Sequence, residues 1–558
     1  MSAAPRGRNR RAARAADRPT GARTDATSAR RRRPRAASGP MLRCAAMMRS
    51  PFTADDRARL ADRGIDEPEA LRQLAQLREP PPRTVLVRPC TAGDGIVRWD
   101  DAERARLAAV HEAAAARGEL AAFVPASGAA TRMFRDLLAG LATGSGLERD
   151  RVTGLADAGD AAMRTLLEFP DGLPRFAFHD ALADAVAARG GSLVALAPDG
   201  PWRPVLEALL GEPGLGYAQR PKGLILFHRD ADGARTAFAE HLAEAAALYR
   251  DATGRVRLHA TASPEHLDGF RAELERARSG GATYDVTFSV QDPATDTLAI
   301  GADGEPARDG HGALVLRPAG HGALLANLER APAPVVMLRN IDNIAAAPWR
   351  APVLERTRAV VGAAVALRGA ATELACRLDA GDADAADDAR AFLATHGFAG
   401  GDAADAAALR AAVDRPLRVC GMVPNTGEPG GGPFWVRGTD GRVTRQVVET
   451  AQVDAADAAQ RAILAASTHF NPVFMACALD DAHGRRHALA RFVDADAVIV
   501  TRRSAGGRDV VALERPGLWN GGMAGWNTVF VEVPLAVFNP VKTVNDLLRR
   551  EHQPADGT

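Results

Sequence analysis

Short apolar segments of strand length alternate with longer segments of helical pattern through the middle of this chain. Residues 255–263 (RVRLHATAS) and 284–290 (YDVTFSV) have the composition of strands, and residues 264–278 between them have helical spacing. A strand, a helix and a second strand in this order indicate parallel strands joined by a crossover helix. We therefore expect an α/β fold with a mostly parallel central sheet.

Other segments fit the same architecture. Residues 121–140 are predicted as a strand, a turn of small residues and a helix. Further strands are expected at 224–227 and 334–338, and helices at 52–78 (two short ones, the first capped by Thr53), 100–118, 233–249 and 350–395.

These elements suggest five regions. They are a disordered Arg-rich tail (1–50), an N-terminal helical segment (51–118), an α/β core with helical insertions (119–415), a C-terminal α+β region of short strands and Gly-rich turns (416–550) and a short tail (551–558). The first region carries fourteen arginines and two aspartates, so the remaining chain has a net charge of −11. We expect no nucleic-acid partner, because the body of the protein is mildly acidic. The alternative is that the basic tail is a nucleic-acid-binding arm.

The cysteines and the apolar segments indicate a cytoplasmic protein. The five cysteines are far apart and form no CxxC pair, which favours a reducing compartment over a disulfide framework or a zinc site. No apolar run reaches the ~18 residues of a membrane span, and the N-terminus has no apolar segment of a secretory signal. We expect no membrane association.

Lysine is almost absent from the sequence. Of 70 basic residues only Lys222 and Lys542 are lysines. Where arginine has replaced lysine almost everywhere, the remaining lysines are expected at sites that need a compact ammonium group. Chance retention of either lysine is the alternative.

The turn at 127–132 is the first candidate site. It consists of Ser127, Gly128, Ala129, Ala130 and Thr131, followed by Arg132. Small residues between a strand and a helix let backbone N–H groups approach a phosphate, and the helix N-terminus adds a field that favours anions. The alternative is a tight turn with a surface arginine. No GK[ST] follows, so this is not a Walker loop.

Three other segments carry polar groups that suit a phosphorylated ligand. Lys222 immediately precedes a predicted strand, Gly320 and His321 lie in a Gly-rich turn, and Asp342 follows the apolar strand at 334–338. Ligands of open α/β sheets bind beyond the carboxyl ends of the strands, and a carboxylate there can hold Mg²⁺ beside phosphates. Taken singly, each segment also fits an ordinary loop or an Asx turn.

Several segments, in their order along the chain, resemble those of the sugar-nucleotide pyrophosphorylases of the UDP-glucose and UDP-N-acetylhexosamine type. They are SGAATRM (127–133), PKG (221–223), FSVQ (288–291), PAGHG (318–322), IDN (341–343), VVET (447–450), STHF (467–470) and FNPVKTVNDLL (538–548). Both lysines fall on lysine positions of that superfamily. The chain is most similar to an uncharacterised bacterial family known only as domain of unknown function 4301, which shares the FTxxD start and the RVCGMVPNTGEPGGGPFWV stretch.

The resemblance implies a Rossmann-like (GT-A-like) nucleotidyltransferase core that transfers a nucleotidyl group, expected to be uridylyl, between a nucleoside triphosphate and a sugar 1-phosphate with Mg²⁺ as cofactor. It also implies roles for single residues. Arg132 and the 127–131 backbone would hold the β- and γ-phosphates, and Lys222 and Lys542 would flank the α-phosphate and the sugar phosphate. Asp342 would bind Mg²⁺. The base and ribose would be contacted by Gln291, Gly320 and His321, and the sugar by Glu449, His469 and Asn471.

Two departures from the superfamily pattern leave alternatives open. Ala130 stands where the superfamily has the glycine before the Thr-Arg pair, and Ser127 replaces an earlier glycine. An added methyl group would crowd a phosphate oxygen. The alternatives are a non-catalytic nucleotide-sugar-binding protein and a nucleotidyltransferase that uses another nucleotide or a non-sugar phosphate acceptor. The roughly 90 residues between Arg132 and Lys222 are expected to form an insertion that serves as a lid or an interface.

Overall fold

The computed structural model describes residues 50–555, apart from 145, 279–281, 428–430 and 506–507. The predicted disordered tail therefore lies, except for Ser50, outside the described residues. Residues Phe52–Thr558 belong to one structural unit.

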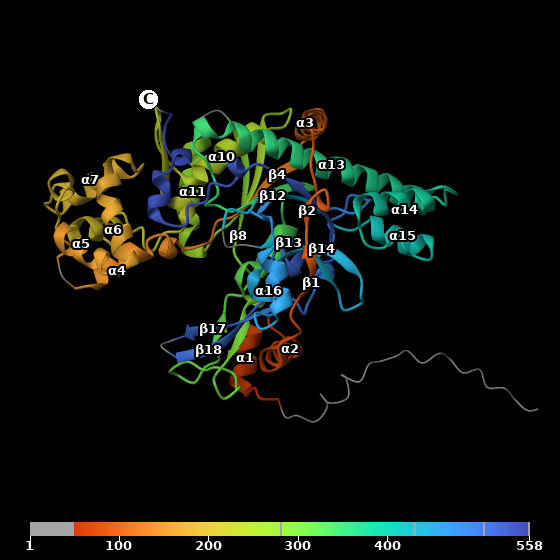
Figure 1. Ribbon diagram of the computed structural model, residues 1–558, viewed down its shortest axis with the longest axis horizontal. Coiled ribbons are helices and arrows are strands. Elements are labelled where there is room, and N and C mark those ends of the chain that lie inside the picture. The colour runs from red at the N-terminus through yellow and green to blue at the C-terminus, as the bar shows by residue number, and fades with distance from the viewer. Residues whose placement is uncertain (1–49, 145, 279–281, 428–430, 506–507, 556–558) are drawn as a thin grey trace, which may run out of the picture. The chain divides into compact units, whose positions relative to one another are not determined.

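A ten-stranded sheet forms the centre of this unit (Figure 1). Its strand order is β2 (Thr91–Ala92), β3 (Gly95–Val97), β19 (Asn527–Glu532), β12 (Leu417–Pro424), β16 (Phe474–Ala478), β11 (Val335–Arg339), β4 (Leu120–Pro125), β7 (Arg255–Thr261) and β8 (Thr283–Ser289), with β15 (His469–Phe470) paired to β12. Only β16 runs antiparallel to its two neighbours along this path. The predicted α/β fold with a mostly parallel central sheet is confirmed. Nearly every residue of β4, β11 and β12 is buried, as expected for strands covered on both faces.

The predicted strand–helix–strand unit is present in the expected order. β7 is followed by α11 (Leu267–Arg278) and then by β8, which pairs with β7 in parallel. The strand expected at 224–227 differs from the prediction in its bounds and in the sheet to which it belongs. Residues Lys222–Leu224 form a 3₁₀ turn, and β5 (Leu226–Asp230) pairs with β6 (Gly233–Thr236) in a separate hairpin outside the central sheet. A strand is thus present, but it begins at Leu226 and lies in a local hairpin rather than in the central sheet. The next helix, α10 (Ala237–Leu248), begins at its Thr236 cap.

The N-terminal segment contains strands as well as the predicted helices. The helices are α1 (Ala54–Asp62), α2 (Glu67–Arg78) and α3 (Asp101–Ala116), and Thr53 caps α1 as predicted. β1 (Val85–Pro89) joins β13 (Gly432–Arg437) and β14 (Val443–Val448) in a three-stranded antiparallel sheet. A four-stranded sheet contains β10 (Leu316–Arg317), β9 (Thr297–Ile300), β18 (Arg508–Glu514) and β17 (Ile499–Ala505). The predicted boundary at 415 separates strands that share the central sheet, since β12, β16 and β19 all follow it.

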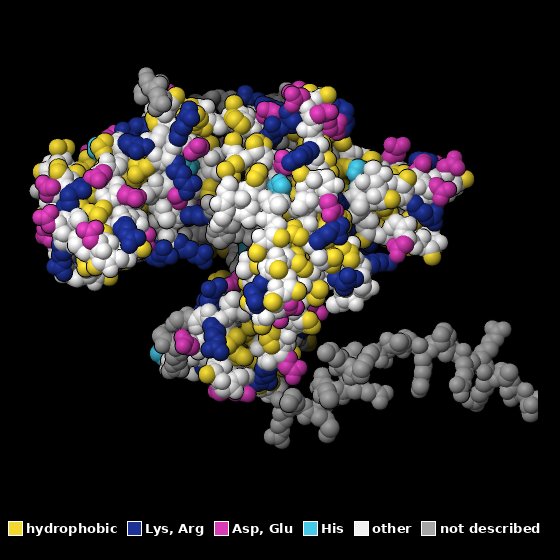
Figure 2. Space-filling view, viewed as in Figure 1, with side chains coloured by type: hydrophobic (Ala, Val, Ile, Leu, Met, Phe, Trp, Pro, Cys, Tyr) yellow, Lys and Arg dark blue, Asp and Glu magenta, His cyan; other side chains and the backbone are white. Residues whose placement is uncertain are grey.

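Six helices fill the predicted insertion between Arg132 and Lys222. They are α4 (Arg135–Ala142), α5 (Arg149–Asp157), α6 (Ala161–Gly172), α7 (His179–Ala188), α8 (Leu193–Leu196) and α9 (Arg203–Leu210). Aromatic side chains contribute to their core: the rings of Phe176 and Phe178 are stacked 4.8 Å apart, and Tyr217 meets Phe178 edge-on. Figure 2 shows acidic and basic side chains interspersed over these helices in this view.

The longest described helix, α13 (Ala351–Asp379), covers the sheet. It packs against α3, β11, β12 and β16, and α14 (Ala385–His396) and α15 (Ala406–Val413) follow it. By length and composition α13 could cross a membrane, so the expectation that no segment reaches that length was wrong. Core helices of soluble folds pass the same test, and 44% of its most apolar window is buried. The remaining helices are α12 (Leu325–Glu329) and α16 (Ala458–Ala465).

A glycine sets the close approach between α13 and α3. A Cβ atom added at Gly362 would lie 1.9 Å from the carbonyl oxygen of Leu107 in α3, whereas one added at the exposed Gly369 would have no neighbour within 4 Å. We expect Gly362→Ala to lower the free energy of unfolding by about 1–3 kcal/mol, because the two helices must move apart. Gly369→Ala in the same helix should raise it by about 0.5–1 kcal/mol. Urea unfolding of both variants checks this, and an equal response of the two would contradict it.

Candidate functional site

Two segments far apart in sequence are joined at the carboxyl end of β11. The backbone N–H of Val541 donates to the carbonyl of Asp342 (3.0 Å), and the N–H of Asn539 donates to Oδ1 of the buried Asn343 (2.8 Å). Asn343 and Pro540 form an additional β-bridge. The turn after β11 therefore fixes the segment that carries Lys542.

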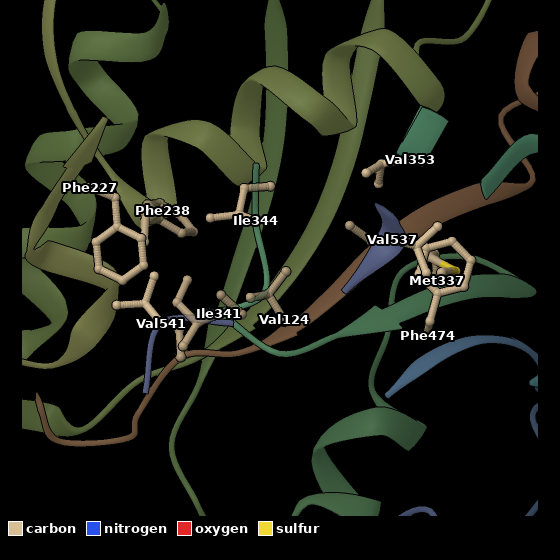
Figure 3. Packing of buried hydrophobic residues seen from close by; sticks show 14 of the residues in the cluster. Val124, Phe227, Phe238, Met337, Ile341, Ile344, Val353, Phe474, Val537 and Val541 are labelled. Carbon is tan, nitrogen blue, oxygen red and sulfur yellow. The ribbon is translucent and has the colours of Figure 1, made fainter. Parts of the chain in front are cut away.

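Buried apolar residues determine which side chains of these segments face outward. Ile341 and Val541 are 5% and 0% exposed and belong to the main hydrophobic cluster. Figure 3 shows both near Phe227 and Phe238 in this core. Their polar neighbours Asp342 and Lys542 instead line a common cavity.

Lys222 bridges the two segments. Its Nζ donates to Oδ2 of Asp342 (2.6 Å) and to the carbonyl oxygen of Val541 (2.7 Å). The side chains of Lys222 and Asp342 are 13% and 22% exposed, so the pair lies in a partly water-excluded position. A single ammonium nitrogen that meets two acceptors in a narrow space is the setting expected of a retained lysine.

The second lysine, Lys542, is the next residue in the chain after Val541. Lys542 is exposed, and its Nζ lies 5.6 Å from the ring centre of Phe538. Its backbone N–H donates to Oδ2 of Asp546 (2.7 Å), which also forms a capping box with Thr543. The structure thus brings Lys222 and Lys542 to the same place.

The turn at 127–132 adjoins Lys222. The N–H of Lys222 donates to the carbonyl of Gly128 (3.2 Å), and the N–H of Ala130 donates to the carbonyl of Arg220 (3.1 Å). Thr131 and Arg132 are exposed. The methyl group of Ala130 is buried in the main cluster, so the core accommodates this departure from glycine. The expected helix N-terminus is displaced: Ala130–Arg132 form a 3₁₀ turn, and α4 begins at Arg135.

A cavity of about 540 Å³ brings together some of the predicted site residues. Its lining includes the predicted residues His321, Asp342, Glu449, Asn471 and Lys542. The other lining residues are Asn340, Asn343, Gly431, Thr450, Ala451, Phe470, Pro472, Val473, Trp519, Phe538 and Pro540. The lining therefore combines aromatic side chains with a lysine and two carboxylates.

The position and tautomer of His321 are fixed by its neighbours. The ring stacks on Trp519, with centres 3.8 Å apart and planes 10° from parallel. The backbone N–H of Leu518 donates to Nδ1 (2.9 Å), so the proton of the neutral ring is on Nε2, which lies 3.2 Å from Oε1 of Glu449. Gly320 has a φ of +73°, which lets the chain turn sharply before His321.

Three predicted residues have other partners. The amide of Gln291, after β8, donates to Thr295 (3.5 Å), and His469 lies between Thr468 (2.8 Å) and Glu532 (3.3 Å); neither is among the residues lining the cavity. Asn471 lines it, but its side chain donates to the carbonyl of Gly421 (3.1 Å) and accepts from the N–H of Val473 (3.0 Å).

The buried groups behind the 341–343 turn were not predicted from the sequence. Arg339 forms a buried ion pair with Glu244 and donates to the carbonyl of Asn343 (2.6 Å). His241 lies 3.2 Å from the carbonyl of Ile341, and burial lowers its pKa to about 4, so it is neutral and donates to that carbonyl. An arginine that ends the apolar strand VVML was a usable signal, because such residues are rarely buried without a partner.

Residues 53–553 match a family model described as a domain of unknown function (DUF4301). A search of curated proteins finds no match. Among solved structures, the chain is similar to the uridine diphosphate N-acetylglucosamine pyrophosphorylase from Trypanosoma brucei, with 13% identity, 89% of this chain and 79% of that chain covered and a TM-score of 0.45. It is also similar to a mutant UDP-glucose pyrophosphorylase from Leishmania major in complex with UDP-glucose, with 14% identity, 89% and 79% covered and a TM-score of 0.42.

The buried histidines predict how stability depends on pH. Burial lowers the pKa values of His111, His241 and His259 to about 4, and burial and His228 lower that of His552 to about 3. Between pH 6.5 and 4 the unfolded chain binds more protons at these sites, so the free energy of unfolding should fall as the pH falls.

His241→Gln, which keeps a side-chain N–H donor, should reduce the slope of this dependence by up to about 1.4 kcal/mol per pH unit. Urea unfolding of wild type and variant at several pH values measures it. Identical slopes would mean that His241 is already protonated in the folded protein.

Proposed function

The chain belongs to the DUF4301 family, and we propose that it is a nucleotidyltransferase that transfers a nucleotidyl group between a nucleoside triphosphate and a sugar 1-phosphate, with release of pyrophosphate. The proposed nucleotidyl group is uridylyl, because the sequence motifs resemble those of the UDP-sugar pyrophosphorylases. The observation that carries the proposal is the convergence of Lys222, Lys542, Asp342 and the turn at 127–132.

The location of this cluster supports a ligand site. β4 and β11 are parallel neighbours, and the turns that follow their carboxyl ends contain residues 127–132 and Asp342. Ligands of open α/β sheets bind beyond the carboxyl ends of the strands. Two ammonium groups at this edge, with the exposed Arg132 in the adjoining turn, suit a ligand with several phosphates.

The reaction needs positioning and charge neutralisation rather than a covalent enzyme intermediate. An oxygen of the sugar 1-phosphate attacks the α-phosphorus, and the bond from that phosphorus to the bridging oxygen of the leaving pyrophosphate breaks. In this proposal Lys222 and Lys542 offset the charge on the two reacting phosphates. The backbone at 127–131 and Arg132 hold the β- and γ-phosphates.

The carboxylate of Asp342 is a suitable type of ligand for the proposed Mg²⁺. Among the described residues, no group of three or more His, Cys, Asp or Glu side chains is placed to hold a metal ion by itself. Mg²⁺ in phosphate-transfer sites is commonly bound by one or two carboxylates together with substrate phosphates and water, so one carboxylate beside the phosphate position is sufficient. A bound Mg²⁺ would add positive charge to the substrate phosphates.

The cavity supplies contacts for the rest of the substrate. His321 and Gly320 are proposed to contact the base or ribose, with Trp519 as the support of the imidazole ring. Glu449 and Asn471 are proposed on the sugar side, as lining residues. Gln291 and His469 lie outside the lining, so a role for either requires a substrate that extends beyond this cavity.

The lysine pair gives the sharpest test. Lys222→Arg and Lys542→Arg should each lower turnover about 10²–10³-fold, because a broad guanidinium cannot replace an ammonium group placed against a reacting phosphate. The assay is exchange of labelled pyrophosphate over a panel of nucleoside triphosphates and sugar 1-phosphates with Mg²⁺. Arg151→Lys in α5 is the surface control, and thermal unfolding verifies folding. Wild-type turnover in both folded lysine variants would refute the proposed role.

A binding measurement separates catalysis from the non-catalytic alternative. We expect a UDP-sugar with Mg²⁺ at about 100 times its Kd to stabilise the protein by ~2.7 kcal/mol in thermal unfolding. We also expect pyrophosphate exchange with the same ligand. Binding without exchange would assign a non-catalytic nucleotide-sugar-binding protein instead.

A further inference from the structure

A second cavity, of about 510 Å³, is bordered by β13, β14, the segment 491–497 and the turn 520–525. Three arginines line it: Arg415, Arg442 and Arg491. It shares no lining residue with the cavity that contains Asp342 and Lys542. The sequence motifs give this cavity no role.

Arg415 is a charged group without a counter-ion. It makes no hydrogen bond and no ion pair with any residue of the described chain, and it is half-buried. Burial, and secondarily the like charge of Arg442, lower its pKa. A guanidinium remains charged in proteins, so an anion in the cavity would offset the cost of its partial burial.

The neighbouring arginines add to the need for an anionic ligand. Arg491 also has no hydrogen-bond or ion-pair partner for its side chain within the described residues, and it is exposed and lines the cavity. Arg442 is paired with Asp402 (3.1 Å) and lies 4.0 Å from Asp440. Two guanidinium groups thus remain available for one ligand.

Two carboxylates complete the lining and restrict the ligand. Asp440 and Asp494 also border the cavity, so it has an excess of one positive charge. Carboxylates next to arginines accept hydrogen bonds from hydroxyl groups and repel a second anionic group. A ligand with one strongly anionic end and several hydroxyl groups satisfies both halves of the lining.

We propose that this cavity binds a small hydroxylated phosphate ester, with Arg415 and Arg491 on the phosphate and Asp440 and Asp494 on the hydroxyl groups. Guanidinium groups bind phosphate oxygens through paired, charge-assisted hydrogen bonds, which favours phosphate at the arginine end.

A polar wall separates the two cavities. Asn520, which lines the second cavity, donates to Oε1 of Gln452 (2.9 Å) and to Oε1 of Glu449 (3.4 Å), and Glu449 lines the first. The phosphate-ester site is therefore adjacent to the proposed transfer site but independent of its lysines.

The test is calorimetric titration of the full chain with inorganic phosphate and with glycerol 3-phosphate. Arg415→Gln and Arg491→Gln should each raise the Kd of both probes at least about tenfold, since each removes a charge-assisted contact. Arg491 is exposed, so its variant remains informative if Arg415→Gln fails to fold. Arg151→Gln in α5 makes the same charge change elsewhere and should leave both Kd values unchanged.

The outcomes separate this inference from the proposed transferase activity. Glycerol 3-phosphate should bind more tightly than inorganic phosphate, and Lys222→Arg and Lys542→Arg should leave its Kd unchanged. Binding that is lost in the lysine variants but kept in the arginine variants would place the probes in the transfer site and overturn the inference, with the transferase proposal intact. Equal affinity for the two probes, or no saturable binding of either, would also overturn it.

Discussion

The ammonium group of Lys222 is the interaction on which the candidate site depends. It joins the turn after β11, through Asp342, to the segment that ends in Lys542, through the carbonyl of Val541, at 2.6 and 2.7 Å. Its own backbone N–H is held by Gly128 in the turn after β4. Three distant parts of the chain therefore meet at one residue, two of them at its ammonium nitrogen, and the geometry of the candidate site follows from that meeting.

The buried layer behind this edge explains why it can be rigid. Arg339 and Glu244 pair inside the protein, and Arg339 and His241 hold the carbonyl groups of Asn343 and Ile341. Removing one member of a buried charge pair leaves the other uncompensated, so such networks fix backbone geometry strongly. The cavity-lining Asn343 is thus supported by buried polar groups behind the turn.

Features encoded locally could be predicted, and features that depend on distant pairing could not. The β7–α11–β8 unit and the Thr53 cap follow from periodicity and capping residues within a few positions. The scarcity of lysine singled out Lys222 and Lys542 as candidate site residues without any structural information. By contrast, the insertion of β16 between β11 and β12, and the hairpin that removes β5 from the sheet, depend on partners that local pattern does not specify. The side chain of Asn471, which lines the cavity, also holds the backbone at Gly421 and Val473, a contact that the sequence did not indicate.

The β-bridge between Asn343 and Pro540 has a consequence for synthesis on the ribosome. Nearly two hundred residues separate these partners, and the later one emerges after every strand of the central sheet has been made. Lys222 can therefore meet Gly128 and Asp342 long before its carbonyl acceptor at Val541, which follows the last strand of the sheet by nine residues, has been made. The candidate site is therefore completed by one of the last segments to be synthesised.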